Sequence, residues 1–268
     1  VKDFKILQKI NSGGFGSVYS VQNIKTGDTL AAKVLSSNKE ESLYKKMITR
    51  EIGIMIRCQH PTIIKFYGYS LKDFHDEKNA TIFMELFHKG SLAELLSKVK
   101  NGLLDIMYDN TNRQIILIGV ARGMMYLHQH QIIHRDLKPG NILLDEDLHP
   151  HITDFGLSKV YDTGQSNDQS QQCGTSVYMA PEIVEGTQYN GKADVYAFGI
   201  LMYEVITDLV PFPLYQSGKM KPLQFSNKVV YENYRPSFDV PIKNSLQNLI
   251  EKCWSKDPKE RPTFDELF

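Results

Sequence analysis

Hydrophobic positions divide this chain into a strand-rich first third and a helix-rich remainder. In the first third, short or alternating apolar runs are separated by glycines and polar turns, the pattern of an antiparallel sheet. The expected strands are residues 4–10, 17–21, 29–35, 63–69 and 80–86. Five strands would make a sheet of common size.

One helix is expected to interrupt these strands. Between residues 40 and 57, apolar side chains recur at helical spacing, and the segment ends before His60-Pro61. Beyond residue 90 the periodicity is helical, so the boundary between the two parts is expected at residues 87–90. The main helices expected there are residues 112–130, 192–207 and 243–254. The polar stretch 159–172 has no apolar period and predicts a mobile loop.

Composition narrows the class of protein. With 41% hydrophobic and 23% charged residues among 268, the chain has the composition of an ordinary globular protein, and its length suits one large domain or two lobes. Lysine and arginine number 31, as do aspartate and glutamate. This balance argues against a broad basic surface, so neither a nucleic-acid partner nor an anionic membrane is expected.

The cysteines and the apolar runs indicate in which cellular compartment the protein is expected and whether it crosses a membrane. Cys58, Cys173 and Cys253 are odd in number and lack zinc-ligand spacing, which favours a reducing compartment and no structural metal. The apolar runs 115–121 and 195–206 are too short to cross a bilayer. The chain opens on Val1 without a charged n-region or cleavage site, so we expect a domain excerpt of a cytoplasmic protein with no membrane insertion in this segment.

Two features of the first third could bind a phosphate. The sequence NSGGFGSV at residues 11–18 lies between two expected strands, where glycines let backbone amides approach a triphosphate, although a simple hairpin turn has the same pattern. Lys33 lies inside a strand that looks buried, and a buried lysine needs a partner. Glu51 on the following helix could supply it, unless both side chains are solvated at the surface.

The centre of the chain carries carboxylates and an amide that could take part in catalysis or bind a metal ion. The sequence HRDLKPGN fills residues 134–141, and DFG follows at residues 154–156. Asp136 could orient an attacking hydroxyl or accept its proton. Asn141 and Asp154 offer hard oxygen ligands to Mg²⁺, and Lys138 offers positive charge to a transferred phosphoryl group.

Together with Ala180-Pro181-Glu182, these motifs occur in the order and at the spacing of the protein kinase signature set, so the chain resembles a eukaryotic protein kinase domain from about residue 4 to residue 268. The resemblance implies an α+β, bilobal fold over residues 1–268. A small β-rich N-lobe with one main helix would span about 1–86, a hinge about 85–90, and a larger, mainly helical C-lobe about 91–268.

The resemblance also implies roles for the catalytic residues. Lys33, paired with Glu51, would bind the α- and β-phosphates of ATP, and Asp136 would be the catalytic base. Lys138 would contact the γ-phosphate. Asn141 and Asp154 would bind Mg²⁺, or Mn²⁺ in its place. Glu182 would pair with Arg261 as a structural contact.

Nucleotide binding is implied for a larger set of residues. Met84 would guard the back of the adenine pocket, although a core methionine is an alternative, and the backbone of residues 85–87 would bind adenine. The whole implied set is Ile10, Asn11, Gly13, Gly14, Gly16, Val18, Ala31, Lys33, Met84, Glu85, Phe87 and Leu143. The stack of side chains that ties the lobes together in this family matches Met55, Phe66, His134 and Phe155.

The kind of substrate is indicated by a few positions. Lys138 and Thr175 are typical of kinases that phosphorylate serine or threonine in proteins, and the segments 194–199 and 253–264 resemble the tyrosine-kinase-like group. A dual-specificity kinase is an alternative. A pseudokinase that binds nucleotide and partners without transfer is another, although it would be expected to lack Lys33, Asp136 or Asp154.

Two positions depart from the family pattern, and one loop suggests control. Asn11 replaces the first glycine of the phosphate-covering loop, and because Asn tolerates positive φ we expect nucleotide binding to be weakened or unaltered rather than lost. Gly140 adds flexibility but removes no catalytic group. Phosphorylation of the polar loop, which contains Thr163, Ser166 and Ser170, is predicted to pair with Arg135 and order the segment.

Overall fold

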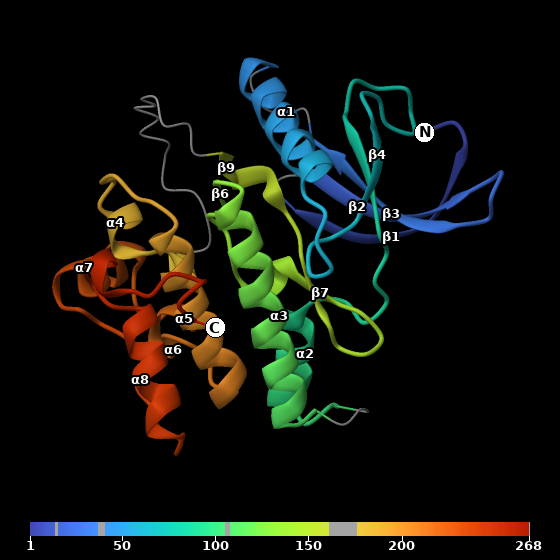
Figure 1. Ribbon diagram of the computed structural model, residues 1–268. Coiled ribbons are helices and arrows are strands. Elements are labelled where there is room, and N and C mark those ends of the chain that lie inside the picture. Colours follow the sequence, from blue (N-terminus) through green and yellow to red (C-terminus); the bar gives the residue numbers. More distant parts are fainter. Residues whose placement is uncertain (14–15, 37–40, 105–107, 161–175, 268) are drawn as a thin grey trace.

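The structure, a computed structural model, describes residues 1–13, 16–36, 41–104, 108–160 and 176–267. A sheet with one long helix beside it forms the N-terminal part, and helices form most of the remainder (Figure 1). This arrangement confirms the predicted α+β kinase fold. The predicted site residues Gly14 and Thr175 and the three loop hydroxyls at residues 163, 166 and 170 lie outside the described residues.

The N-terminal sheet is antiparallel, with strand order β1-β2-β3-β5-β4. Its strands are β1 Phe4–Gly13, β2 Gly16–Asn23, β3 Thr29–Leu35, β4 Phe66–Ser70 and β5 Thr81–Met84. β4 starts later than the predicted residue 63, because the backbone there bonds elsewhere. Ile64 N donates to Ile152 O, and Ile152 N donates to Thr62 O.

Helix α1 (Glu41–Arg57) packs its apolar face against the sheet. Ile48, Ile52 and Met55 are buried there, as the helical spacing predicted. The hydroxyl of Tyr44 ties α1 to the sheet, since it donates to Leu35 O at 3.3 Å and accepts from Ala80 N at 2.7 Å. These contacts fix the face of α1 that carries Glu51.

The C-terminal part contains the remaining helices. They are α2 Leu92–Lys100, α3 Asn110–Gln129, α4 Pro181–Val184, α5 Lys192–Thr207, α6 Pro213–Gln216, α7 Pro222–Tyr231 and α8 Asn244–Cys253. α3 starts earlier than predicted because the Asp109 carboxylate caps it, accepting from Thr111 N and Asn112 N. Among the described residues, no helix is long and apolar enough to cross a bilayer.

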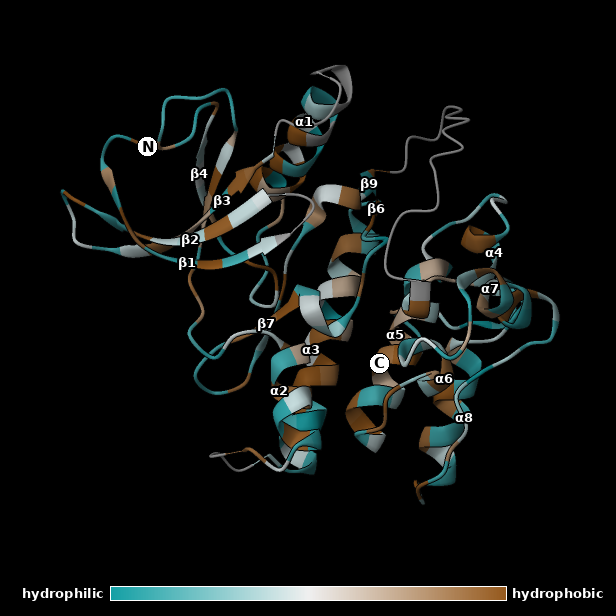
Figure 2. Cartoon of the chain, turned by 180° about the vertical axis from the view of Figure 1, so that it is seen from behind, coloured by the Kyte–Doolittle hydropathy of each residue, from teal (hydrophilic) through white to brown (hydrophobic). Residues whose placement is uncertain are grey.

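Helix α5 lies at the centre of the helical part. Nearly all of its residues are buried, whereas hydrophobic and hydrophilic residues share α2 and α8, as expected of helices with one face in the core (Figure 2). The hydrophobic core is continuous between the two parts, running from Ala31 and Ile52 through Ile142 to Ile200. The sheet is therefore seated on the helical part by apolar packing.

Short elements between the two parts carry the central motifs. They are β6 Ile132–Ile133, β7 Ile142–Leu144, β8 Pro150–Ile152 and β9 Lys159–Val160, with the 3₁₀ turns η1 Pro139–Asn141 and η2 Phe155–Leu157. Turns η3 Ser176–Tyr178 and η4 Pro258–Glu260 lie further along the chain. β6 pairs with β9, and β7 pairs with β8. The prediction of a loop over 159–172 was thus wrong at its start, where Lys159 and Val160 form strand β9. A strand of two residues is too short to show a hydrophobic period in the sequence.

Candidate active site

Lys33 on β3 is the centre of an ion-pair network between the sheet, α1 and η2. Its ammonium lies 2.6 Å from Glu51 Oε1 and 2.9 Å from Asp154 Oδ1. The side chains of Lys33 and Glu51 are 12% and 3% exposed, so both are inside the protein and the surface-charge alternative is wrong. Three residues that are distant in sequence are therefore held together by one ammonium.

The network favours the charged forms of Lys33 and Asp154, whereas burial raises the pKa of Glu51 despite the neighbouring ammonium. Burial alone would lower the pKa of Lys33, but the carboxylates of Glu51 and Asp154 outweigh it and raise that pKa, so the lysine stays protonated. Burial would also raise the pKa of Asp154, but Lys33 lowers it below its usual value. Asp154 is consequently an anion at neutral pH, as a cation ligand must be.

Asp136 lies in a second cluster, on the loop between β6 and β7. Lys138 Nζ is 2.7 Å from Asp136 Oδ2, and Asn141 Nδ2 donates to the same oxygen at 2.9 Å and to Asp136 O at 2.7 Å. Asp136 and Asn141 are each 6% exposed. The two hydrogen bonds fix the Asn141 amide so that its oxygen is the atom available to a cation.

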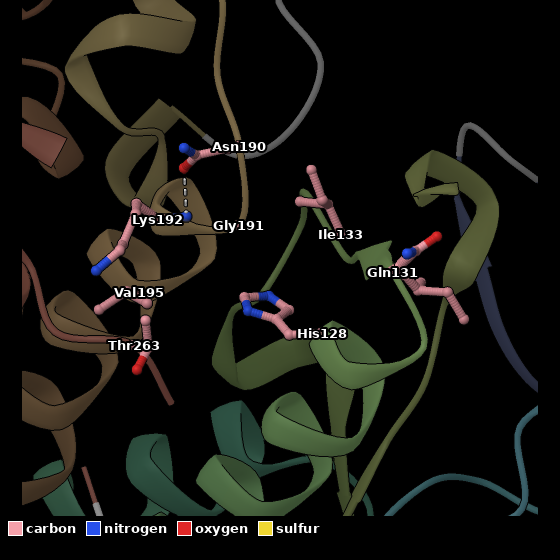
Figure 3. A pocket seen from close by; sticks show the side chains of 9 residues that line it. His128, Gln131, Ile133, Asn190, Gly191, Lys192, Val195 and Thr263 are labelled. Carbon is pink, nitrogen blue, oxygen red and sulfur yellow. Dashed lines mark hydrogen bonds between the residues drawn. The ribbon is translucent and has the colours of Figure 1, made fainter. Parts of the chain in front are cut away.

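Asp194, at the start of α5, holds the backbone that leads into Asp136. Its carboxylate accepts from His134 N and Arg135 N, both at 2.9 Å. Arg135 has a φ of 70°, a left-handed conformation that is unfavourable for a bulky residue and needs such support. His128 on α3 donates from Nε2 to Asp194 at 2.8 Å and lines a cavity of about 350 Å³ beside the start of α5 (Figure 3).

The segment 154–156 turns sharply into η2. Asp154 has a φ of 65°, and Phe155 is fully buried with its ring 5.4 Å from that of His134. Phe155 and Met55 belong to the continuous core, and Phe66 packs against it. The four side chains predicted to connect the two parts therefore come from α1, β4, the β6–β7 loop and η2, and lie in or against one core cluster.

The described residues predicted to bind nucleotide come from β1, β2, β3, β5, the segment after β5, and β7. Ala31 pairs with Met84 in adjacent strands, and both are buried. Val18, Leu143 and Phe87 are partly buried against the core, whereas Ile10 is 47% exposed. Glu85 N donates to Lys65 O, which anchors the segment after β5.

The glycine-rich hairpin needs glycine at one described position. Gly13 pairs with Gly16, which has a φ of 137°, and a Cβ on Gly16 would lie 2.0 Å from Val34 O. Asn11, in contrast, lies beside a register shift in β1, pairs with Val18, and does not have a positive φ. The reason we gave for tolerance of Asn11 is therefore wrong, since its backbone makes no demand for positive φ.

Similarity to known proteins agrees with this geometry. The protein kinase domain family matches residues 4–268. The chain belongs to the protein kinase domain family. This kinase domain is 32% identical over 267 residues to serine/threonine-protein kinase STY46 of Arabidopsis thaliana, a match that covers 100% of this chain and 43% of that protein.

The names of other relatives of this kinase domain specify different classes of phosphorylated residue. The dual specificity protein kinase pyk3 of Dictyostelium discoideum is 34% identical over 98% of this chain and 18% of that protein. The seven transmembrane domain-containing tyrosine-protein kinase 1 of the same organism is 36% identical over 98% of this chain and 37% of that protein. The chain thus spans less than half the length of these relatives.

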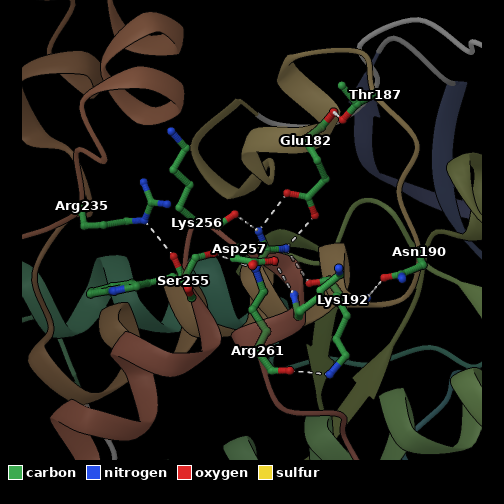
Figure 4. A network of polar contacts seen from close by, with 11 residues as sticks. Glu182, Thr187, Asn190, Lys192, Arg235, Ser255, Lys256, Asp257 and Arg261 are labelled. Carbon is green, nitrogen blue, oxygen red and sulfur yellow. Dashed lines mark hydrogen bonds and ion pairs between the residues drawn. The ribbon is translucent and has the colours of Figure 1, made fainter.

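Two polar contacts hold the segment around residues 178–182, which follows the residues that the structure does not describe. The predicted Glu182–Arg261 pair is present as a bidentate contact of 2.6 and 2.8 Å, and Arg261 also donates to Ser255 O and Lys192 O (Figure 4). Tyr178 donates to Glu204 Oε2 at 2.5 Å. Lys100 Nζ on α2 contacts the other oxygen of Glu204 at 3.0 Å.

Sequence reasoning gave no role to Asp194, His128, or the Tyr178–Glu204–Lys100 set. A signal existed for the carboxylates, because Asp194 and Glu204 stand inside the apolar run of α5 and buried acids need partners. No local pattern marks His128 or Lys100, since their partners are distant in sequence.

The donor set fits ATP with a divalent cation. Asp154 supplies an anionic carboxylate, and Asn141 supplies an amide oxygen turned away from Asp136 by the hydrogen bonds of its nitrogen. Hard oxygen ligands suit Mg²⁺ or Mn²⁺, which commonly complete their coordination with phosphate oxygens and water. Lys33 adds a cation where phosphates would lie.

Replacing Asp194 with Asn should make the free energy of unfolding decrease less as pH falls into the acid range. Burial would raise the pKa of Asp194, but the hydrogen bond from His128 and other contacts lower it below the ordinary 3.8. An acid with a lowered folded pKa stabilises the fold above its unfolded pKa, and this stabilisation is lost as pH falls through the folded pKa. Urea unfolding should show that the free energies of unfolding of wild type and Asp194→Asn differ less at pH 3 than at pH 7. An equal difference at both pH values would contradict the assignment.

Proposed function

We propose that this chain is an active protein kinase that transfers the γ-phosphoryl group of ATP to serine or threonine hydroxyls of proteins. The observation that carries the proposal is the simultaneous presence of the Lys33–Glu51–Asp154 network and the Asp136–Lys138–Asn141 cluster. A pseudokinase would have no need to keep every one of these costly buried charges paired.

Each residue has a separate task in the proposed reaction. Lys33, held by Glu51, binds the α- and β-phosphates, and Asp154 and Asn141 hold the cation, which neutralises charge on the phosphates when it is bound. Asp136 orients the substrate hydroxyl and accepts its proton. Lys138, already beside Asp136, stabilises negative charge on the transferred group.

Nucleotide specificity rests on the segment after β5. The backbone of Glu85 and Phe87 binds the adenine edge, with Met84 behind it and Ala31, Val18 and Leu143 above and below the ring. Ile10 and the backbone of Asn11, Gly13, Gly14 and Gly16 cover the sugar and the phosphates. Backbone amides are the donors that such a glycine-rich turn provides.

The serine/threonine preference is supported by Lys138, whose ammonium donates to Asp136 Oδ2 at 2.7 Å. It rests further on Thr175 and on the tyrosine-kinase-like motifs, and the name of STY46 agrees with it. Arg135, whose guanidinium lies 5.3 Å from the Tyr189 ring, is proposed to receive a phosphate added to the loop 159–172.

A degenerate peptide library tests the hydroxyl class directly. With ATP and Mg²⁺, peptides with a central serine or threonine should be phosphorylated about tenfold or more faster than the tyrosine series, because Lys138 beside Asp136 leaves less room for a phenol ring than for a short hydroxyl side chain. The same library with the Asp136→Asn variant serves as the blank. Equal rates for tyrosine would replace the proposal by dual specificity, and no transfer at all would favour a pseudokinase.

A further inference from the structure

A cavity of about 480 Å³ lies between the end of α1, the start of β4 and the segment after β5. Its volume is in the range of small-molecule sites. Most of its wall is apolar, from Met55, Ile63, Ile64 and Phe66. The polar residues in the wall include Glu85 and His151, which approach from separate elements.

His151 on β8 is a partly buried imidazole, with its side chain 14% exposed, that the proposed reaction does not use. Within the described residues, neither of its ring nitrogens has a hydrogen-bond partner, although both nitrogen atoms are shielded from solvent. Its ring lies 4.3 Å from that of Phe87, and its Nε2 is 3.6 Å from Asp145 Oδ2, which is longer than a hydrogen bond. A buried polar group without a partner is costly, so a ligand that bonds to it gains the full value of that contact.

Glu85 contributes a carboxylate with no ion-pair partner in the described part of the chain. Lys65, also in the cavity wall, directs its ammonium toward the Tyr67 ring, 5.0 Å from the ring centroid. Glu85 and Asp145 both act electrostatically on His151. Glu85 therefore brings a carboxylate to the polar end of the cavity, while the Lys65 ammonium is directed to the Tyr67 ring.

We propose that this cavity binds a small organic amine with an apolar body. The ammonium would donate to the Glu85 carboxylate and to the unprotonated nitrogen of His151, and the apolar body would lie against Met55 and Phe66. Charge-assisted hydrogen bonds in a partly desolvated site favour an ammonium over a neutral head of the same size. A carboxylate head would meet Glu85 and be rejected.

The site shares Glu85 with the segment proposed to bind adenine, but its wall contains none of Lys33, Glu51, Asp136, Lys138, Asn141 and Asp154. Met55 is on the same helix as Glu51, and Phe66 pairs with Met84 across β4 and β5. A bound amine would thus contact α1, the helix that carries Glu51, and the start of β4. Its binding needs no phosphoryl transfer, so the binding test stands whether or not the proposed function holds.

Methyl NMR titration of the full chain with phenylbutylamine tests the proposal. Phenylbutanol and phenylbutyrate carry the same body with a neutral and an anionic head. The amine should bind saturably, shift the methyl signals of Met55, Ile63 and Ile64, and bind about fivefold more tightly than the alcohol. Equal binding of the three probes, preference for the acid, or shifts elsewhere would overturn the proposal.

Two variants make the assignment specific. Glu85→Gln should reduce the preference for the amine over the alcohol to about twofold or less, while Glu251→Gln, an exposed carboxylate on α8, should leave it unchanged. His151→Leu should weaken the amine without lowering the melting temperature, because it removes unpartnered nitrogens. An unchanged amine affinity in both cavity variants would show that the head group binds elsewhere.

Discussion

The Asp136→Asn protein is expected to transfer phosphate about 10²–10⁴-fold more slowly than wild type. The substitution keeps an oxygen that can accept from Asn141 but removes the negative charge that Lys138 faces and that would accept the hydroxyl proton. The Lys33–Glu51–Asp154 network is untouched, so binding of ATP with Mg²⁺ should be retained. Initial rates with peptide substrate and calorimetric titration of ATP separate the two effects.

The matched control for this experiment is Asp147→Asn, an exposed aspartate on the β7–β8 turn. It makes the same chemical change outside the proposed site and should keep its rate. Turnover of Asp136→Asn close to that of wild type would remove Asp136 from the role of base. Loss of ATP binding in Asp136→Asn would mean that the substitution disturbs the loop rather than the proton transfer.

Arg261→Met is expected to have the largest effect on stability. Its guanidinium is fully buried against Glu182, so the variant leaves a buried carboxylate without its cation. Breaking one side of a buried ion pair costs about 3–5 kcal/mol. For a domain of this size, that loss corresponds to a fall of roughly 6–20 °C in melting temperature. Urea unfolding and thermal scanning measure the two quantities.

A second variant separates the loss of the cation from the loss of packing. Arg261→Met combined with Glu182→Leu should be more stable than Arg261→Met alone, because no charge is then left unpaired. Lys228→Met, which breaks the exposed Lys228–Glu232 pair, should cost about 0.5 kcal/mol or less. If Arg261→Met were as mild as Lys228→Met, the Glu182–Arg261 pair would not hold the fold.

Much of the fold could be predicted because it depends on local patterns. The helix at residues 192–207 matches α5, and the strand at 29–35 matches β3, since length and apolar content mark both. β6, β7, β8 and β9 were missed because two or three residues cannot show a period. Their pairing is decided by partners far along the chain.

The candidate site shows the same division. Lys33, Glu51, Asp136 and Asp154 could be proposed from the sequence because their motifs occur in a fixed order, and the predicted Lys33–Glu51 contact is present. Asp194 and His128 were not assigned a role, because nothing near them in sequence shows that one carboxylate accepts from His134, Arg135 and His128 together. The cavity lined by Glu85 and His151 likewise could not be predicted from the sequence.

The sequence by itself therefore determined the kinase family, the two-part α+β fold and the residues proposed to transfer phosphate. Only the tertiary structure decided which charges are buried, which carboxylate supports the loop around Asp136, and that Asn11 needs no special backbone conformation. The physical reason is that motifs and periodicity are local properties. Burial and ion pairing depend on which distant segments the core brings together.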